Sequence, residues 1–354
     1  MNPRKTELAQ ISPTDIAAHL CLPVNRLWQI ARNNESFFHP PRSKRIGSKN
    51  RTLDVPRKWH KKRLKKVHKL LASKIIFPKP AHGGVKGRSC RTSALRHLNR
   101  EAVIKRDVKN CFPAIDSRKF YRQLLRMGLR IDTARLLSLL MTVRNRVPQG
   151  SPTSNDALNL YLWLNDNKLQ KMVAEQGGKY TRYADDITVS TNVSEKIESI
   201  GTSIEQSIED NALKINQDKK DYDGLRLINE PQEVQGFLVN SKKGLQIPTA
   251  KRDAAREDAR SFVRASRCVQ PSSLVAVAKK REALVGTINY QAQAEINDTK
   301  HLRKQLRAGE RLVQKRLERD GLNAQAKRWW KQNKKRTLWQ QLAKTWQNRQ
   351  TCKS

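Results

Sequence analysis

The stretch Lys179-Tyr-Thr-Arg-Tyr-Ala-Asp-Asp-Ile-Thr-Val-Ser190 decides the fold. Its β-branched and aromatic residues on both sides of a polar centre predict a β-hairpin with Asp185 and Asp186 at the turn. Adjacent carboxylates repel each other and raise one pKa, and a divalent cation removes that penalty. An Asp-Asp pair in a turn is by itself more often a plain solvated turn. The hairpin therefore needs a second observation before it predicts a metal site.

A second strand supplies that observation. Ala102-Val-Ile-Lys-Arg-Asp107 ends at an acid that lies 185 − 107 = 78 residues before Asp185. The two carboxylates converge only if their strands are neighbours in one sheet, so we expect a shared sheet. Mg²⁺ prefers oxygen ligands and typically takes one or two carboxylates together with substrate phosphates. Two such ions about 3.5–4 Å apart would activate a 3′-hydroxyl and steady a leaving pyrophosphate, which is the chemistry of nucleotidyl transfer.

The charge of the chain points to a polyanionic partner. Lys and Arg number 72 against 32 Asp and Glu, a net charge of +40, and a basic surface binds nucleic acid by releasing counterions from phosphates. The longest apolar runs, such as Leu136–Met141, are far shorter than the roughly 20 residues that a spanning helix needs. With no apolar signal region in the first ten residues, we expect a cytoplasmic protein without a membrane partner. The five scattered cysteines predict no disulfide framework.

The remaining chain reads mostly as helices and basic loops. Residues 12–33 predict two short helices, with Ser12 or Thr14 as the first cap. Between residues 42 and 70 there are 13 Lys or Arg and one acid, with a strand at 51–55 and a helix from about Arg57 whose cations we expect to contact phosphates. Residues 81–89 form a glycine-rich loop. Beyond about residue 251 the chain is helical and basic.

Several motifs together carry a resemblance to a known family. Tyr183-Ala-Asp-Asp186 is accompanied, in order, by four further segments: Arg106–Ile115, Val147–Asn155, Leu213–Lys220 and Glu233–Val239. These are similar to the catalytic hairpin, the first catalytic motif, the template and nucleotide loop, the lysine motif and the primer-grip strands of bacterial reverse transcriptases of the retron or retron-like, defence-associated class. Upstream residues also fit the family: Lys49-Asn-Arg51, Val55-Pro56, Gly87-Arg-Ser89, Ala94 and His97. Ordered motifs are far more specific than any one alone.

The resemblance implies an α+β fold of the right-hand polymerase type, with fingers, an antiparallel-sheet palm and a helical thumb. We expect an N-terminal helical module over residues 1–40 and fingers and palm over 41–248. The thumb is expected over 249–310, with Leu284–Tyr290 on one of its helices, and a basic Trp-rich extension over 311–354.

The resemblance also assigns the metal and its ligands. It implies two Mg²⁺ ions, for which Mn²⁺ can substitute, held by Asp107, Asp185, Asp186 and the backbone carbonyl of Val108. Lys219 is the candidate that protonates the departing pyrophosphate, and Lys220 is the alternative for that role.

Further residues match the family's nucleotide and nucleic-acid contacts. Phe112 corresponds to the aromatic gate against a ribose 2′-hydroxyl, although a core phenylalanine is the alternative. Gln149 and Gly150 correspond to the loop around the incoming base and sugar. Arg51, with Lys49, corresponds to the cation at the triphosphate. The nucleic-acid contacts are expected at Gly236 in the primer grip and at Trp329, Trp330 and Lys331 in the extension, where packing on the thumb is the alternative.

The implied function is RNA-directed DNA polymerisation on a structured non-coding RNA within a retron-like antiviral defence system. Expected partners are the template RNA, the RNA–DNA hybrid product, deoxynucleoside triphosphates and a toxin or effector protein. The alternatives are a diversity-generating or group II intron-like enzyme and an inactive RNA-binding relative. The template loop ends in Ser154-Asn155, whereas diversity-generating enzymes typically have Ser-Gln there. An inactive relative has no reason to keep the three aspartates with Phe112 and Gln149.

Overall fold

The computed structural model describes residues 10–46, 49–219, 224–269, 273–294 and 298–319, and the chain forms two compact units, residues 1–235 and 236–354. Within the described ranges no helix is both long enough and apolar enough to cross a membrane. All cysteines of the described part are free thiols.

The first unit contains most of the helices of the described chain. In chain order they are α1 (Pro13–Leu20), α2 (Val24–Arg32), η2 (Asn34–Phe37), α3 (Lys58–Lys74), α4 (Cys90–Ala94), η3 (Leu95–His97), α5 (Cys111–Ala114), α6 (Ser117–Arg126), α7 (Ile131–Met141), α8 (Ser154–Tyr161), α9 (Trp163–Glu175), η4 (Ser194–Lys196), α10 (Ile197–Asp210) and η5 (Gln217–Lys219).

The N-terminal helices begin and end where the sequence predicts. The Ser12 side chain accepts a hydrogen bond from the Asp15 backbone N–H, and the Asp15 carboxylate accepts one in return, which makes a capping box for α1. Cys21, in the left-handed conformation, ends α1, and α2 starts directly after Pro23. Two short helices in residues 12–33 are therefore confirmed, with Ser12 as the cap.

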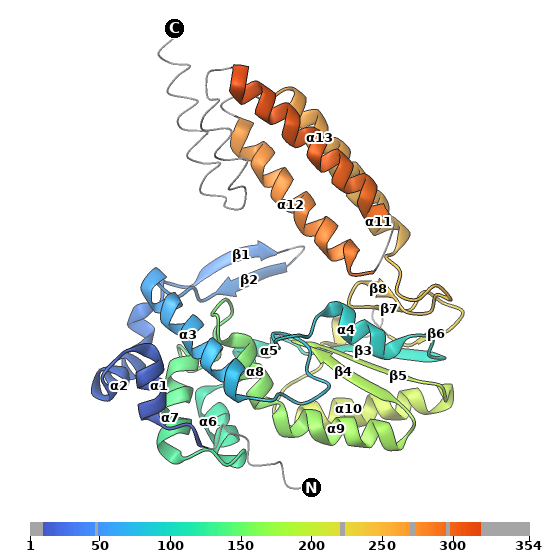
Figure 1. The fold of residues 1–354 in the computed structure, drawn as a ribbon. Helices are drawn as coiled ribbons and strands as arrows, with labels where there is room; N and C mark the ends of the chain where they lie inside the picture. The colour runs from blue at the N-terminus through green and yellow to red at the C-terminus, as the bar shows by residue number, and fades with distance from the viewer. Residues whose placement is uncertain (1–9, 47–48, 220–223, 270–272, 295–297, 320–354) are drawn as a thin grey trace. The chain divides into compact units, whose positions relative to one another are not determined.

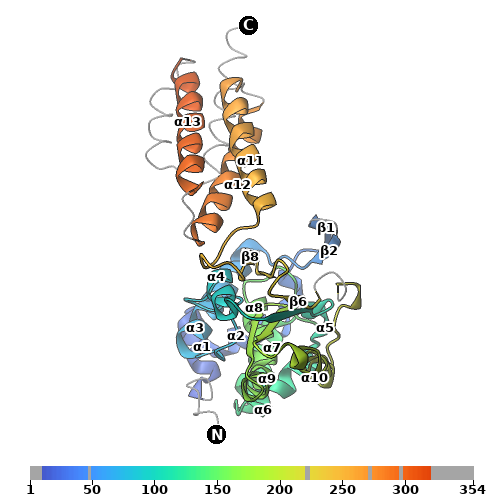
Figure 2. The ribbon, with the colours of Figure 1, turned by 90° about the vertical axis from the view of Figure 1, so that its right-hand side faces the viewer.

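A four-stranded antiparallel sheet lies at the centre of the first unit. It contains β4 (Lys179–Tyr183), β5 (Asp186–Thr191), β3 (Ala102–Asp107) and β6 (Arg226–Leu227) in that spatial order. Helices α9 and α10 cover one face, and α4 with η3 packs against β4 on the other (Figures 1 and 2). The strand at 102–107, the hairpin at 179–190 and their shared sheet are all confirmed, so the predicted α+β class with an antiparallel sheet holds.

A separate two-stranded hairpin, β1 (Arg42–Ile46) with β2 (Lys49–Leu53), carries Arg51 in the first unit. An isolated β-bridge between Phe38 and Pro56 closes the base of this hairpin. One continuous apolar core joins α1, α2, α3, α7 and α8 to the sheet and to α9 and α10. The catalytic segments of the sequence thus rest on the largest core of the described chain.

The second unit is mainly a three-helix bundle of α11 (Thr249–Arg267), α12 (Leu274–Ala292) and α13 (Asp298–Arg319). Two short strands lie at the boundary in sequence: β7 (Glu233–Val234) belongs to the first unit and β8 (Phe237–Leu238) to the second. Its core includes Phe262 of α11 and Val313 of α13. The Phe262 ring packs on Gly309, where an added Cβ would lie 2.4 Å from it. The expected boundary at residue 310 therefore falls inside α13, because Val313 continues the buried face of that helix.

Candidate active site

The hairpin turn and the end of β3 bring two carboxylates together. Asp107 pairs with Asp186 in the β3–β5 register, and Tyr183 pairs with Asp186 across the hairpin, so Ala184 and Asp185 form the turn. Ala184 takes a left-handed φ of 55°. The backbone N–H of Val108 donates to the Asp185 carbonyl at 3.0 Å. This bond ties the residue after Asp107 to the turn itself.

A buried arginine holds the hairpin from behind. Arg182 is fully buried on β4, where its Nε and Nη2 donate to both oxygens of the buried Asp166 at 2.9 and 2.6 Å. Its Nη1 donates to the carbonyl of Ala184 at 2.9 Å, and Nη2 also donates to Asn159. Tyr180 donates to the same Asp166, and burial raises the pKa of that phenol well above its usual value. The turn is therefore fixed by charge-assisted bonds.

The glycine-rich loop forms part of this support. The backbone N–H of Arg182 donates to Pro80, and that of His82 donates to Arg182, so the loop runs alongside β4. Gly83 lies so close to the turn that an added Cβ would be 2.3 Å from the Ala184 nitrogen. The Arg88 guanidinium in turn donates to the carbonyls of Phe77, Pro78 and Ala81. The sequence indicated only a loop here, because the contacts of this loop with Arg182 and Ala184 join segments about 100 residues apart.

Asp107 has a partner that the sequence pattern does not reveal. Asn216 donates from its backbone to the Asp107 carbonyl at 2.7 Å and from its Nδ2 to the Asp107 carboxylate at 2.9 Å. Asn216 lies in the segment 213–220, whose resemblance to the family rests on its lysines rather than on this amide. The amide orients one oxygen of the Asp107 carboxylate at the edge of the cavity.

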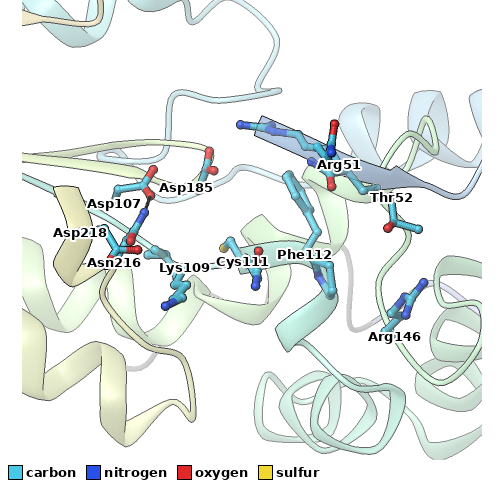
Figure 3. A pocket seen from close by; sticks show the side chains of 15 residues that line it. Arg51, Thr52, Asp107, Lys109, Cys111, Phe112, Arg146, Asp185, Asn216 and Asp218 are labelled. Atoms are coloured by element: carbon cyan, nitrogen blue, oxygen red, sulfur yellow. Dashed lines mark hydrogen bonds between the residues drawn. The ribbon is translucent and has the colours of Figure 1, made fainter. Parts of the chain in front are cut away.

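These groups open onto one cavity of ≈ 390 Å³. Figure 3 shows Asp107 and Asp185 at one end, Arg51 and Thr52 at the other, and Phe112 near Arg51. The lining residues are Asn50, Arg51, Thr52, Asp107, Val108, Lys109, Asn110, Cys111, Phe112, Pro113, Arg146, Gln149, Asp185, Asn216 and Asp218. Six of the predicted site residues therefore share this cavity: Arg51, Asp107, Val108, Phe112, Gln149 and Asp185.

The other predicted site residues either do not line this cavity or have side chains that the structure does not describe. Gly150 and Asp186 are not part of the lining, although Asp186 starts β5 opposite Asp107. Lys49 is on β2 and Lys219 is on η5, but their side chains are not described, and Lys220, Trp329, Trp330 and Lys331 lie outside the described residues. Gly236, in the second unit, has φ 87°, and an added Cβ would lie 1.9 Å from the Tyr290 hydroxyl.

Phe112 belongs to the short helix α5, whose residues Cys111, Phe112 and Pro113 line the cavity. Asn110 adopts a left-handed φ of 48° just before α5, and the buried Cys111 anchors that helix in the core. Burial also raises the pKa of the Cys111 thiol, which keeps the thiol protonated and unreactive. Phe112 itself is half-buried: it packs against the core and also lines the cavity.

The end of the cavity with Arg51 is held by a buried acid. The Asp54 N–H donates to the Gln149 carbonyl at 2.9 Å, and its buried carboxylate accepts from Arg144 at 2.8 Å and lies 3.4 Å from Arg146. Arg144 and Asn145 both take positive φ in a two-residue turn. Asp54 thus joins the end of β2 to the loop that carries Gln149.

The donor set suits a hard cation whose coordination is completed by a substrate. Within the described ranges, no group of three or more His, Cys, Asp or Glu side chains could hold a metal ion by itself. Mg²⁺ commonly takes one or two protein carboxylates and fills its remaining positions with phosphate oxygens and water. Asp107, Asp185 and Val108 line one cavity and fit that mode of binding, with the Val108 carbonyl as the predicted further ligand.

Comparisons with known proteins agree with the site. Residues 47–222 match the family model for reverse transcriptase (RNA-dependent DNA polymerase). The retron Mx65 reverse transcriptase of Myxococcus xanthus is 30% identical over 257 residues, which cover 65% of this chain and 58% of that protein. The retron Mx162 reverse transcriptase of the same organism is 31% identical over 250 residues, covering 60% and 49%. The chain thus spans about half to three fifths of the length of these curated relatives.

Telomerases are among the solved structures to which the chain is similar. A telomerase from Candida albicans, solved in complex with a fragment of telomeric RNA, aligns over 82% of this chain and 62% of that chain. The TM-score is 0.41 and the sequence identity is 11%.

Proposed function

We propose that this chain, which belongs to the reverse transcriptase family and to its bacterial retron class, is an RNA-directed DNA polymerase. One observation carries the proposal: Asp107 and Asp185, from two strands of one sheet, line the same cavity as Arg51, Phe112 and Gln149. The family match together with the observed α+β fold confirms the predicted right-hand polymerase class.

In this proposal the carboxylate end of the cavity holds Mg²⁺, for which Mn²⁺ can substitute. Asp107, Asp185 and the Val108 carbonyl are the ligands supported by their position, and Asp186 remains the predicted third carboxylate. When bound, the ions lower the pKa of a primer hydroxyl and neutralise charge on the leaving pyrophosphate. Asn216 keeps the Asp107 carboxylate oriented, and the Arg182–Asp166 pair keeps Asp185 in place.

The opposite end binds the deoxynucleoside triphosphate. Arg51 neutralises its phosphates, with Lys49 as the predicted second cation, and Gln149 contacts the base and sugar beside Gly150. Phe112 fills the space that a 2′-hydroxyl would need, which is the one group that distinguishes RNA precursors from DNA precursors. Lys219 remains the proposed proton donor to pyrophosphate.

The finer parts of the function are also proposals. The template is a structured non-coding RNA, and the product is an RNA–DNA hybrid, contacted by Gly236 and by Trp329, Trp330 and Lys331. The relatives are retron reverse transcriptases, and a retron-like antiviral role with a toxin or effector protein, in the cytoplasm, is part of this proposal. The cognate RNA has to be identified from the nucleic acid that copurifies with the protein.

The test is primer extension on a generic primed RNA template with Mg²⁺ and deoxynucleotides. Asp185→Asn, alone and with Asp186→Asn, should reduce extension by at least about 10³-fold, because several kcal/mol of metal-mediated stabilisation are lost. Asp210→Asn, at the exposed end of α10, is the matched control and should extend normally. A folded double mutant that polymerises at the wild-type rate refutes the site. A wild-type protein that binds RNA without extending it favours the inactive RNA-binding relative.

A further inference from the structure

The outer face of α3 has a composition that polymerisation at the cavity does not explain. The helix buries one side, with His60, Leu64, Val67, Leu70 and Leu71 in the interior. The rest of its surface is basic, and the segment 57–74 contains no Asp or Glu. None of its residues lines the cavity with Asp107 and Asp185. The basic surface of α3 is therefore separate from the cavity with Asp107 and Asp185.

The cations of α3 form a regular stripe. Lys58, Lys62, Lys65 and Lys69 recur at spacings of four, three and four residues, so they share one helical face, and all four are exposed. In the described part of the chain, none of the four makes an ion pair. Like charges along a helix repel each other, and an ordered row of phosphates would remove that repulsion. The stripe covers 11 × 1.5 Å, about 16 Å, of helix length.

An exposed indole lies next to the stripe. Trp59 is 40% exposed and lies between the exposed Lys58 and the buried His60. The Phe37 ring meets the indole edge-on with centroids 4.5 Å apart, which holds its orientation. The Arg63 guanidinium lies over the indole at 4.4 Å from the ring centroid. An indole held by an aromatic ring and covered by a guanidinium is a platform on which a base can stack.

We propose that the outer face of α3 binds a single-stranded segment of RNA, with a base stacked on Trp59 and Arg63 and with phosphates along Lys58, Lys62, Lys65 and Lys69. Stacking requires an unpaired base, whereas duplex RNA offers mainly phosphates and 2′-hydroxyls. A membrane surface does not fit, because an interfacial helix needs a free apolar face and that face of α3 is buried in the core. The inference rests on the proposed function only in taking RNA as the ligand.

The experiment measures RNA binding to the full chain without deoxynucleotides, by fluorescence anisotropy with a 12-nucleotide oligouridylate and a 12-base-pair RNA duplex. Trp59→Ala should weaken binding of the single strand by about 5- to 100-fold and leave duplex binding within about twofold. Trp59→Phe keeps an aromatic platform and should stay close to wild type. Oligouridylate containing 4-thiouridine should crosslink to the peptide that contains Trp59.

The lysine stripe is tested by its salt dependence. Lys58→Ala with Lys62→Ala and Lys65→Ala should reduce the slope of log K against log salt for the single strand by about 2, since each lost phosphate contact contributes about 0.7. The matched control removes three exposed lysines elsewhere in the first unit, Lys168, Lys171 and Lys179. The control variant has the same net charge as the variant of the stripe, and its slope of log K against log salt should equal that of the wild type.

Several outcomes overturn the proposal. Equal single-strand affinity for wild type, Trp59→Ala and Trp59→Phe removes the stacking site, and an equal loss for duplex and single strand removes the preference for unpaired bases. Stronger competition by polyglutamate than by RNA of equal charge would assign the surface to an acidic protein instead. Because the binding experiment contains no deoxynucleotides, none of these outcomes bears on the proposed polymerase activity, which primer extension tests separately. Cooperative thermal unfolding of each variant shows that the fold is kept.

Discussion

The two ends of the cavity are built in different ways. The end with Asp107 and Asp185 belongs to the four-stranded sheet and is supported from behind by the fully buried Arg182–Asp166 pair. The end with Arg51 belongs to a two-stranded hairpin whose residues are mostly exposed, and its buried support is Asp54. A two-stranded hairpin has little stability of its own. The core therefore preorganises the carboxylates, whereas the phosphate-binding end depends on a few polar contacts.

Breaking the support of the carboxylate end should have the largest effect on stability. Arg182→Met leaves the buried Asp166 without its cation, which should lower the free energy of unfolding by about 3–5 kcal/mol. Urea denaturation measures the change. Lys171→Met, which removes an exposed pair with Glu175, is the control and should cost about 0.5 kcal/mol or less. A loss for Arg182→Met no larger than for the control would show that the pair does not hold the hairpin.

Phe112 lies between the two ends and tests whether the cavity selects the sugar. Phe112→Ala opens space for a 2′-hydroxyl, so the ratio of ribonucleotide to deoxyribonucleotide incorporation should rise by roughly 10- to 200-fold. Parallel extension reactions with each nucleotide give the ratio. Phe112→Tyr keeps the ring and should keep the wild-type ratio. An unchanged ratio in the alanine variant would return Phe112 to a packing role alone.

Loosening the phosphate-binding end should have the smallest effect. Asp54→Asn keeps the backbone bond to Gln149 but removes the charge that holds Arg144 and Arg146. We expect KM for deoxynucleotides to rise about 3- to 10-fold, equivalent to about 1 kcal/mol, with a smaller change in kcat. Steady-state extension at varied nucleotide concentration measures both. The control is Asp132→Asn, which alters an exposed ion pair with Arg130. Equal KM values for the two variants would show that Asp54 plays no part in nucleotide binding.

Local pattern was sufficient for much of the molecule. The β-branched and aromatic residues of the segment 179–190 predicted β4 and β5, and the segment 102–107, which begins Ala-Val-Ile and ends at Asp107, predicted β3. The resemblance to reverse transcriptases, and not local pattern, implied that Arg51, Phe112 and Gln149 lie with the carboxylates, and all three line their cavity. The local predictions succeed because strand formation, turn formation and metal-ligand chemistry depend on residues that are close in the sequence.

The supports of the site were decided only by the tertiary structure. Asn216 reaches Asp107 across 109 residues, and Asp54 meets Arg144 across 90, and neither pair has a local signature. Arg88 and Gly83 read as parts of a polar loop, yet they build the backing of the hairpin turn. The sequence by itself determined the carboxylates, the charge and the strands, because these follow from residue type and short-range periodicity. Which buried polar groups satisfy one another follows only when packing brings distant segments together, since a buried donor or acceptor must find its partner wherever the fold puts one.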